Sequence, residues 1–328
     1  MKRTILIGIA LAVGWLAPAG VAEERRGGLA LQFDDGWHSW LAEVAPMVKA
    51  HGGVATCFVN NKYIEGGRIG MDELRQLQDE YGWEIGTHTA NHYNAPRYVQ
   101  TKGLDAWLAN ELDPSLKLLK GGGLRVNALV FPFNASTPEI AGAAMTRVGS
   151  FRRETGLALA DRVRPDGSLP GTSIDTTQYA PIDLVKKWID MAHDRNSVLF
   201  LYGHRILPDS AFTTGRVVAV SANAVTLDQP VNLDAGEENV MVPDMERRTA
   251  MRNILTVQSV DGSTVHLAEL APGAVAVGNL VLVGPSYGTR RSDFEEVLRY
   301  GAERLHFYTI GDIQAGKQQV GREIPPSE

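Results

Sequence analysis

The strongest constraint on the fold is a regular alternation of short apolar segments with longer amphipathic segments between residues 28 and 203. The apolar segments have the length and composition of buried strands, and the segments between them carry helical periodicity. The expected strands are Leu29–Phe33, Val54–Asn60, Trp83–Thr87, Asn127–Phe133 and Val198–Gly203, and the expected helices are 38–50, 72–81, 104–119, 138–148 and 182–194. This alternation predicts a largely parallel sheet with right-handed crossovers, as in an α/β barrel or a related layered fold.

A different pattern begins after Pro208. Helical periodicity is weak from 213 to 285 and β-type runs dominate, with Asp261-Gly262 as a hairpin turn signal between two of them. Helix and strand patterns return at Ser292–Arg304 and Leu305–Ile310, so the β-rich block is an insertion into the α/β unit. The expected domains are an α/β domain at 23–210 and 288–318, an inserted β-rich domain at 211–287 and a C-terminal tail at 319–328.

The first 22 residues have the pattern of an export signal. Lys2 and Arg3 precede an apolar stretch at 5–17, and Gly20-Val21-Ala22 supplies small residues for cleavage. The alternative is an uncleaved membrane anchor, but the apolar stretch is shorter than the roughly 20 residues that a span needs. We therefore expect a mature protein without a stable membrane span, exported to the periplasm, the cell wall or the medium.

Composition excludes several classes of function and metal site. The formal net charge of -6, with 32 Lys and Arg, lacks the basic footprint of a nucleic-acid-binding protein and does not favour polyanionic substrates. The single Cys57 can form neither an intramolecular disulfide nor a thiolate zinc site. Any metal must therefore be bound by histidines and carboxylates.

Two adjacent carboxylates follow the first predicted strand in Phe33-Asp34-Asp35-Gly36. At the end of a buried strand they repel each other unless a cation or a shared proton compensates them. In a regular strand they would point to opposite faces, but Gly36 permits a sharp turn that brings both toward one pocket. The alternative is an ordinary Asp-Asp-Gly turn.

Two histidines follow the third predicted strand, His88 and His92. Four residues apart, they would lie on one side of a helical turn, close enough to bind one metal ion. The alternative is a pair of unrelated polar histidines near a loop. Because an acidic pair follows another strand, and the carboxyl ends of parallel strands meet at one face, we favour the metal site.

Two further strand ends carry unusual residues. The segment Val130–Asn134 has no titratable group, so it would act through its backbone or as an apolar wall, and a plain core strand is the alternative. His204 ends an apolar strand, where it would be an acid or base or a structural histidine.

Together these residues predict metal-assisted hydrolysis of an amide or ester. Asp35, His88 and His92 match the two-histidine, one-carboxylate pattern of hydrolytic zinc sites, which leave positions open for water and substrate. Asp34 then remains as a base and His204 as an acid.

These segments resemble the polysaccharide deacetylases, also called the NodB-homology or carbohydrate esterase family 4 proteins. Residues 33–36 are similar to the first motif of that family, and residues 88–92, with the preceding Glu84-Ile85-Gly86, are similar to the second motif. Residues 130–134 are similar to a variant of the third motif, and His204 is similar to the histidine of the last motif. The resemblance covers about 28–208 and 290–312, and leaves the β-rich insertion uncovered.

The resemblance implies a distorted (β/α) barrel with a divalent metal, Zn²⁺ being the expected ion. It implies Asp34 as base, Asp35, His88 and His92 as metal ligands, and His204 as general acid. The backbone amide of Phe133, in the turn with Pro132, would help to hold the oxyanion.

The sequence also departs from the family pattern. Val130 stands where many members have an arginine that pairs with the base, and Arg152, Arg153 and Arg205 are the candidate replacements. Gln32 replaces a common threonine, and Asp175 and Asp183 are the candidates for the residue that orients His204.

We therefore expect an enzyme that removes N-acetyl or O-acetyl groups from an acetylated polysaccharide or oligosaccharide. Trp37, after the Asp-Asp-Gly turn, is the best-placed sugar-stacking residue, whereas Trp40, Trp107 and Trp188 fit a helix core. The insertion would extend the substrate groove, mediate self-association, bind a wall polymer or be a tolerated elaboration. Alternative functions are a non-catalytic glycan-binding protein with this fold and a hydrolase of a non-carbohydrate amide or ester.

Overall fold

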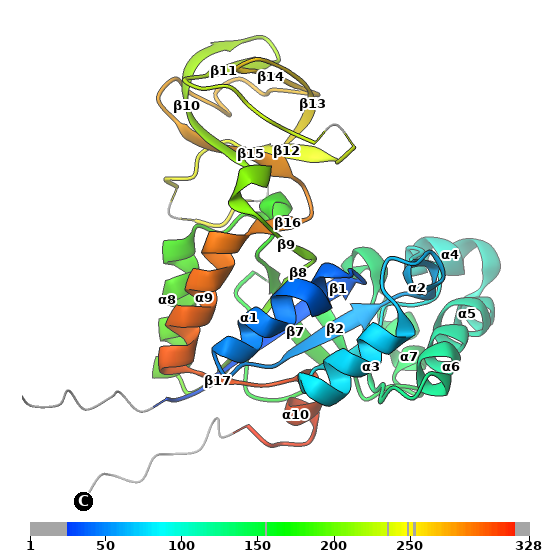
Figure 1. Cartoon of the computed structure of the whole chain (residues 1–328). Helices are drawn as coiled ribbons and strands as arrows, with labels where there is room; N and C mark the ends of the chain where they lie inside the picture. The colour runs from blue at the N-terminus through cyan, green and yellow to red at the C-terminus, as the bar shows by residue number, and fades with distance from the viewer. Residues whose placement is uncertain (1–24, 155, 235, 248, 252–253, 319–328) are drawn as a thin grey trace, which may run out of the picture.

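The computed structural model describes residues 25–318 except 155, 235, 248 and 252–253 (Figure 1). The expected signal peptide at 1–22 and the C-terminal tail at 319–328 lie outside the described residues. Within them, no helix combines the length and apolar character that crossing a membrane requires.

A closed ring of parallel strands forms the centre of the α/β unit. Each strand pairs with its neighbour in parallel, and β1 also pairs with β8, which closes the ring. The strands of the ring are β1 (Gly28–Asp35), β2 (Ala55–Val59), β3 (Glu84–Thr87), β4 (Ala128–Val130), β5 (Ser150–Glu154), β7 (Ser168–Ser173) and β8 (Val198–Gly203). Two short strands, β17 (His306–Phe307) and β6 (Leu159–Ala160), extend it beside β1 and β8.

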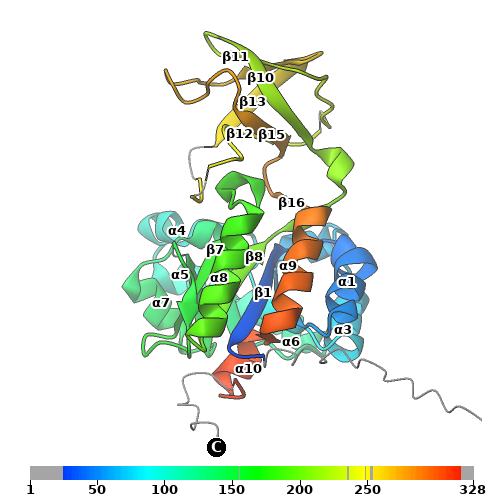
Figure 2. The same ribbon diagram turned by 90° about the vertical axis from the view of Figure 1, so that its left-hand side faces the viewer.

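Helices surround this ring (Figures 1 and 2). The long helices α8 and α9 lie side by side in both views, and α10 lies at the end of the ring away from the inserted domain. The helices are α1 (Ala45–Ala50), α2 (Asn61–Glu65), α3 (Met71–Glu80), α4 (Ala95–Lys102), α5 (Leu104–Trp107), α6 (Asp113–Gly121), α7 (Pro138–Ala144), α8 (Ile182–Asp194), α9 (Arg291–Arg304) and α10 (Ile310–Gln314).

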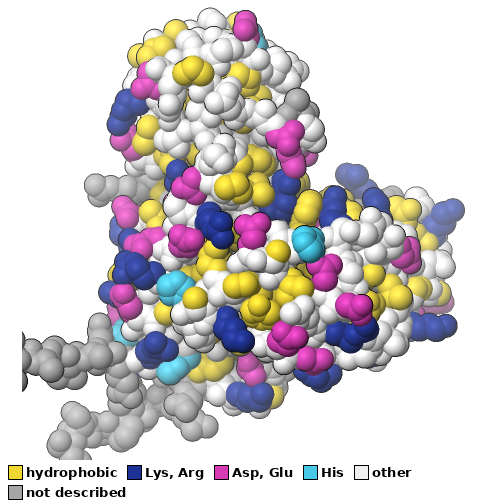
Figure 3. All heavy atoms as spheres, in the orientation of Figure 1, with side chains coloured by type: hydrophobic (Ala, Val, Ile, Leu, Met, Phe, Trp, Pro, Cys, Tyr) yellow, Lys and Arg dark blue, Asp and Glu magenta, His cyan; other side chains and the backbone are white. Residues whose placement is uncertain are grey.

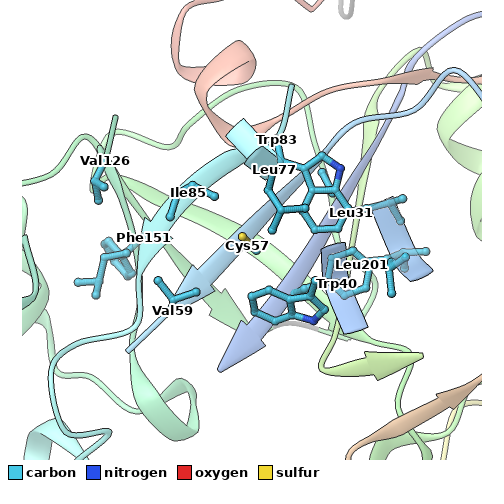
Figure 4. Close-up of a cluster of buried hydrophobic side chains, with 14 of the residues drawn as sticks. Leu31, Trp40, Cys57, Val59, Leu77, Trp83, Ile85, Val126, Phe151 and Leu201 are labelled. Carbon is cyan, nitrogen blue, oxygen red and sulfur yellow. The ribbon is translucent and has the colours of Figure 1, made fainter. Parts of the chain in front are cut away.

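Alternate residues of β1 face the two sides of the ring. Leu29, Leu31 and Phe33 join the large core between strands and helices, part of which Figure 4 shows. Ala30 belongs to the smaller cluster formed with Phe58 and Phe200. Because strand side chains alternate with a period of two, Gln32 and Asp34 share the side of Ala30, and both are buried.

The sequence predicts the strong apolar elements well and the weakly apolar ones poorly. Val198–Gly203 and 182–194 are observed as predicted, but β5 and β7 were not expected. The strand predicted at 127–133 ends at Val130, because Phe133 and Asn134 adopt positive φ. Trp40, Trp107 and Trp188 are buried in the core, as expected.

The inserted residues form a second, antiparallel barrel with its own apolar core (Figure 2). Gly262, with φ of 58°, begins the two-residue turn between β13 and β14, as the Asp-Gly signal indicates. The chain leaves the α/β unit through β9 (Arg205–Leu207) and returns through β16 (Gly288–Arg290), which pairs with it. The barrel strands are β10 (Thr213–Ser221), β11 (Ala224–Leu227), β12 (Asn239–Val242), β13 (Leu255–Asp261), β14 (Thr264–Leu267) and β15 (Leu280–Pro285).

The predicted fold class, a (β/α) barrel with an inserted small all-β domain, is thus confirmed. The domain boundaries proposed from the sequence stay predictions. The barrel strands run from Thr213 to Pro285, inside the predicted 211–287.

We predict that Phe33→Ala destabilises the α/β unit by about 3–5 kcal/mol, because the ring is fully buried. It stacks on Trp83 at 5.4 Å between ring centroids and meets Phe294 edge-on at 5.8 Å. Denaturant unfolding followed by tryptophan fluorescence measures this unit alone, since all six tryptophans precede the insertion. The exposed Leu157→Ala is the control, with an expected change near 0.5 kcal/mol. Equal losses would contradict the packing described.

Candidate metal centre and active site

The two carboxylates after β1 reach one cleft through an unusual backbone conformation. Asp34 keeps the regular alternation and faces the inside of the ring, where it is buried. Asp35 has φ of 86° and Gly36 φ of 117°, so the chain turns sharply at Asp35 itself. Both carboxylates therefore line the same cleft instead of pointing to opposite faces of the strand. A side chain at Gly36 would be strained at this φ and would also come within 3.0 Å of Ile69.

The two histidines also meet, but not on a helix. The helical turn predicted for His88 and His92 is wrong, because the chain after β3 is irregular and Thr89 and His92 have φ of 67° and 61°. The rings nevertheless lie edge to face, with centroids 4.8 Å apart. The connecting loop is held by buried Glu111, whose carboxylate accepts hydrogen bonds from the backbone and side-chain amides of Asn91 at 2.9 and 2.7 Å.

Asp35, His88 and His92 together form a set of donor atoms that fits a divalent metal. Their ligand atoms all lie within 4.8 Å of one another. Asp35 Oδ1 lies 3.3 Å from His92 Nε2 and 3.6 Å from His88 Nε2. This buried oxygen has no hydrogen-bond partner among the described residues, which is the mark of a ligand position.

The protonation of the histidines suits metal binding. His88 Nδ1 donates a hydrogen bond to the carbonyl of Val130 at 2.7 Å, which leaves its Nε2 lone pair directed toward Asp35 and His92. Burial lowers the pKa of His88 and of His92 to about 4, so both rings are neutral at physiological pH. A neutral imidazole is the form that binds a metal. The site therefore offers two neutral nitrogens and one carboxylate, a donor set typical of zinc.

The negative charge of Asp34 is balanced by a different partner, Arg152 of β5. Arg152 Nη1 donates to Asp34 Oδ1 at 2.9 Å, and Nη2 donates to Oδ2, with both side chains buried. Burial raises the pKa of Asp34, but the charge and hydrogen bonds of Arg152 outweigh it and lower the pKa overall. Of the three candidate arginines, Arg152 thus contacts the expected base, whereas Arg153 and Arg205 pair with Asp166 and Glu237.

His204 is oriented by Asp175, not by Asp183, which lies exposed on α8. His204 Nδ1 lies 2.7 Å from Asp175 Oδ2, and the backbone N–H of His204 donates to Oδ1. Burial lowers the pKa of His204, but the charge and hydrogen bond of Asp175 outweigh this and raise it to about 9. The imidazole is therefore a cation at neutral pH, held in one orientation.

The remaining predicted residues lie around this cleft in different ways. Phe133 is 63% exposed, lines the cleft and packs edge-on against His92 at 4.9 Å, whereas Pro132 is buried and does not line it. The contact of Pro132 with substrate stays a prediction; its side chain is buried at the start of the turn that contains Phe133. Trp37 lines the cleft, but the guanidinium groups of Arg68 and Arg205 lie over its ring at 3.9 and 4.7 Å.

The cleft has a volume of about 580 Å³ and is built by both domains. Glu237, Glu238, Ser286 and Tyr287 come from the inserted segment, and the ring of Tyr287 lies 4.9 Å from that of His204. No sequence pattern marks these residues or Arg68, since none belongs to a motif or ends a predicted strand. The exposed face in Figure 3 intersperses acidic and basic side chains, without a large patch of one sign.

Residues 22–135 match a family model described as polysaccharide deacetylase. This part of the chain is similar to the polysaccharide deacetylase family. The matched residues include Asp34, Asp35, His88 and His92 but end before His204. The resemblance stated from the motifs is thereby confirmed. No curated protein matches the sequence.

Several solved structures are similar to parts of the chain. A CE4 family pseudoenzyme from Bacillus anthracis has 16% identity and a TM-score of 0.33, over 38% of this chain and 43% of that one. A peptidoglycan deacetylase from Bacillus subtilis has 19% identity and a TM-score of 0.31, over 38% of this chain and 56% of that one. A family 4 carbohydrate esterase from Streptomyces lividans, in complex with acetate, has 16% identity and a TM-score of 0.37, over 55% of this chain and 80% of that one. The alignment thus spans about half the length of the first two proteins.

We predict that His88→Ala lowers bound zinc per chain from about one to well below half at equal total metal, because one of three ligands is lost. Metal analysis of dialysed protein measures this. The exposed His266→Ala, on the inserted barrel, is the control and should retain the full amount. Equal zinc contents in both variants would remove His88 from the metal site.

We predict that metal-free protein loses stability on the order of 3 kcal/mol between pH 6.5 and pH 9.5 through His204. The raised pKa of about 9 means that the folded state holds the proton more tightly than the unfolded chain. The stabilisation is therefore complete below about pH 6.5 and disappears as the pH rises through 9. In Asp175→Asn this pH dependence should be largely absent. Parallel stability curves for the two proteins in denaturant titrations would show that Asp175 does not set the pKa.

Proposed function

We propose that this chain is an exported, metal-dependent enzyme that removes N-acetyl groups from a polysaccharide or oligosaccharide. The proposal is carried by one arrangement in the cleft. Asp34, a base whose negative charge is balanced by Arg152, and His204, a cationic imidazole, line the same cleft as the three donors of the metal site. Hydrolysis of an amide requires a base for the water and an acid for the amine, and both are provided here.

The metal would be held by Asp35, His88 and His92, with Zn²⁺ as the proposed ion. When bound there, it would polarise the acetyl carbonyl and acidify a water molecule. The chain itself supplies the remaining functions.

Asp34 would accept the proton of the attacking water. Arg152 keeps this buried carboxylate ionised at neutral pH, because it lowers the pKa against the effect of burial. The two hydrogen bonds from Arg152 also fix the orientation of the carboxylate. Arg152 is thus a positioning residue for the base.

His204 would give its proton to the leaving group. Asp175 occupies Nδ1, so Nε2 is the nitrogen available to the cleft. A departing amine needs a proton much more than a departing alcohol does, and His204 is protonated at neutral pH. This favours N-acetyl over O-acetyl groups as the substrate. The backbone amide of Phe133, as the family resemblance implies, would help to stabilise the oxyanion.

The alternative of a non-catalytic glycan-binding protein rested on the missing arginine of the third motif. Because Arg152 contacts Asp34 from another strand, that observation no longer favours it. The proposed location outside the cytoplasm rests on the pattern of residues 1–22 and on the accessibility of polymeric glycans there. Fractionation of cells that express the full chain tests it.

We predict that Asp34→Asn keeps its zinc but releases acetate about 10²- to 10⁴-fold more slowly, since the amide cannot take up the proton. Acetate release from acetylated oligosaccharides of the chitin, peptidoglycan and xylan types is the measurement, with and without a chelator. Asp72→Asn, on the surface of α3, is the matched control. Turnover that survives both the chelator and Asp34→Asn would disprove the proposed function.

A further inference from the structure

Arg68, between α2 and α3, is held in the cleft by two aromatic rings. Its guanidinium carbon lies 3.9 Å from the ring centroid of Trp37 and 3.8 Å from that of Tyr63. Its backbone N–H donates to the carbonyl of Tyr63 at 2.8 Å. All three side chains line the cleft that holds the metal donors. Cation–π contacts of this kind stabilise a guanidinium in a fixed orientation.

The other strongly charged groups of the cleft interior have partners within the described residues. Arg152 pairs with Asp34, His204 with Asp175, and Arg205 with Glu237 through two hydrogen bonds of 2.7 and 2.8 Å. Asp35 belongs to the metal site.

The hydrogen bonds of Arg205 and, to a smaller extent, the charge of Arg68 lower the pKa of Glu237. The charge of Arg68 also acts against burial, which raises the pKa of Asp35. Among the described residues, however, the guanidinium of Arg68 makes no hydrogen bond or ion pair within 4.0 Å. Glu237 is engaged by Arg205, and Asp35 belongs to the metal site. Glu238 also lines the cleft, but it is exposed and makes no ion pair with Arg68. Contacts with ring faces leave the N–H groups at the edge of the guanidinium available for hydrogen bonds. That edge presents parallel N–H donors, whose geometry matches the two oxygens of a carboxylate.

We propose that Arg68 binds a free carboxylate of the substrate, so that the glycan carries an acidic sugar close to the acetylated sugar. This rests on the proposed function and specifies its substrate class. A single carboxylate is compatible with the net charge of -6, because Arg68 contributes a local cation whose guanidinium is not engaged in an ion pair. The specificity of the enzyme would then depend on a residue outside the deacetylase motifs.

Two kinds of sugar supply this chemistry, a uronic acid and a muramic acid whose lactyl carboxyl carries no peptide. Both present a carboxylate on a sugar ring, and separate arms of the experiment distinguish them. The first arm uses N-acetylated oligosaccharides that contain uronic acid, and the second uses peptide-free muramic acid oligomers. Each is compared with the same oligomer after reduction of its carboxyl to an alcohol.

The first measurement is kcat/KM for acetate release. The protein as it exists should prefer the carboxylated oligomer of one arm to its reduced form by about ten- to a hundredfold, the usual value of a charge-assisted hydrogen-bond pair. Arg68→Gln should lose this preference and stay within about threefold on the reduced oligomer. Lys62→Gln, which removes the same charge from the exposed face of α2, should keep the preference.

The second measurement is binding of the same oligomers to zinc-loaded Asp34→Asn protein by calorimetry, with and without Arg68→Gln. It separates the two proposals. If no oligomer is hydrolysed but the carboxylated form binds more tightly in an Arg68-dependent way, the proposed activity fails and the carboxylate site stands. Equal binding of carboxylated and reduced oligomers, or an equal loss of both in Arg68→Gln, would overturn the carboxylate site.

Discussion

The site depends on the backbone turn at Asp35. A regular strand would send Asp34 inward and Asp35 outward, and each would meet a different environment. With φ of 86°, Asp35 instead turns back toward the cleft, and two carboxylates that repel each other line the same cleft. Such a pair is stable only if each charge is compensated. The arrangement of the surrounding residues follows from this requirement.

The negative charges of the two carboxylates are balanced in different ways, and this gives the two side chains different chemical properties. Arg152 lowers the pKa of Asp34, whereas burial raises the pKa of Asp35 and leaves one of its oxygens without a hydrogen bond. Asp34 is thereby kept ionised by Arg152, whereas Asp35 keeps one oxygen available to a ligand. Two identical side chains in adjacent positions thus take separate roles through their environments.

The sequence identifies the parts of the site that end strongly apolar strands, because burial of those strands constrains both the fold and the position of their ends. It could not identify Arg152 as the partner of Asp34. β5 carries arginines at 152 and 153, and β7 reads Ser-Leu-Pro-Gly-Thr-Ser, so neither has an apolar strand pattern. Gly171 of β7 makes room for Arg152, since a side chain there would come within 2.4 Å of its Cδ. The histidine spacing correctly predicted that His88 and His92 lie together, but the helical turn predicted between them is wrong. A loop held by Glu111 connects them instead.

The inserted barrel affects the site through the strands at which it joins the α/β unit. Arg205 follows His204 directly, and its ion pair with Glu237 links β9 to the inserted segment. Tyr287 returns beside His204 just before β16. The insertion therefore forms one wall of the cleft without supplying any of the metal donors. Net charge averages over the whole surface and cannot describe such a cleft, where the guanidinium of Arg68 contacts two aromatic rings and, among the described residues, makes no ion pair within 4.0 Å. Local charge balance, which only the folded chain reveals, is the property on which the proposed carboxylate site rests.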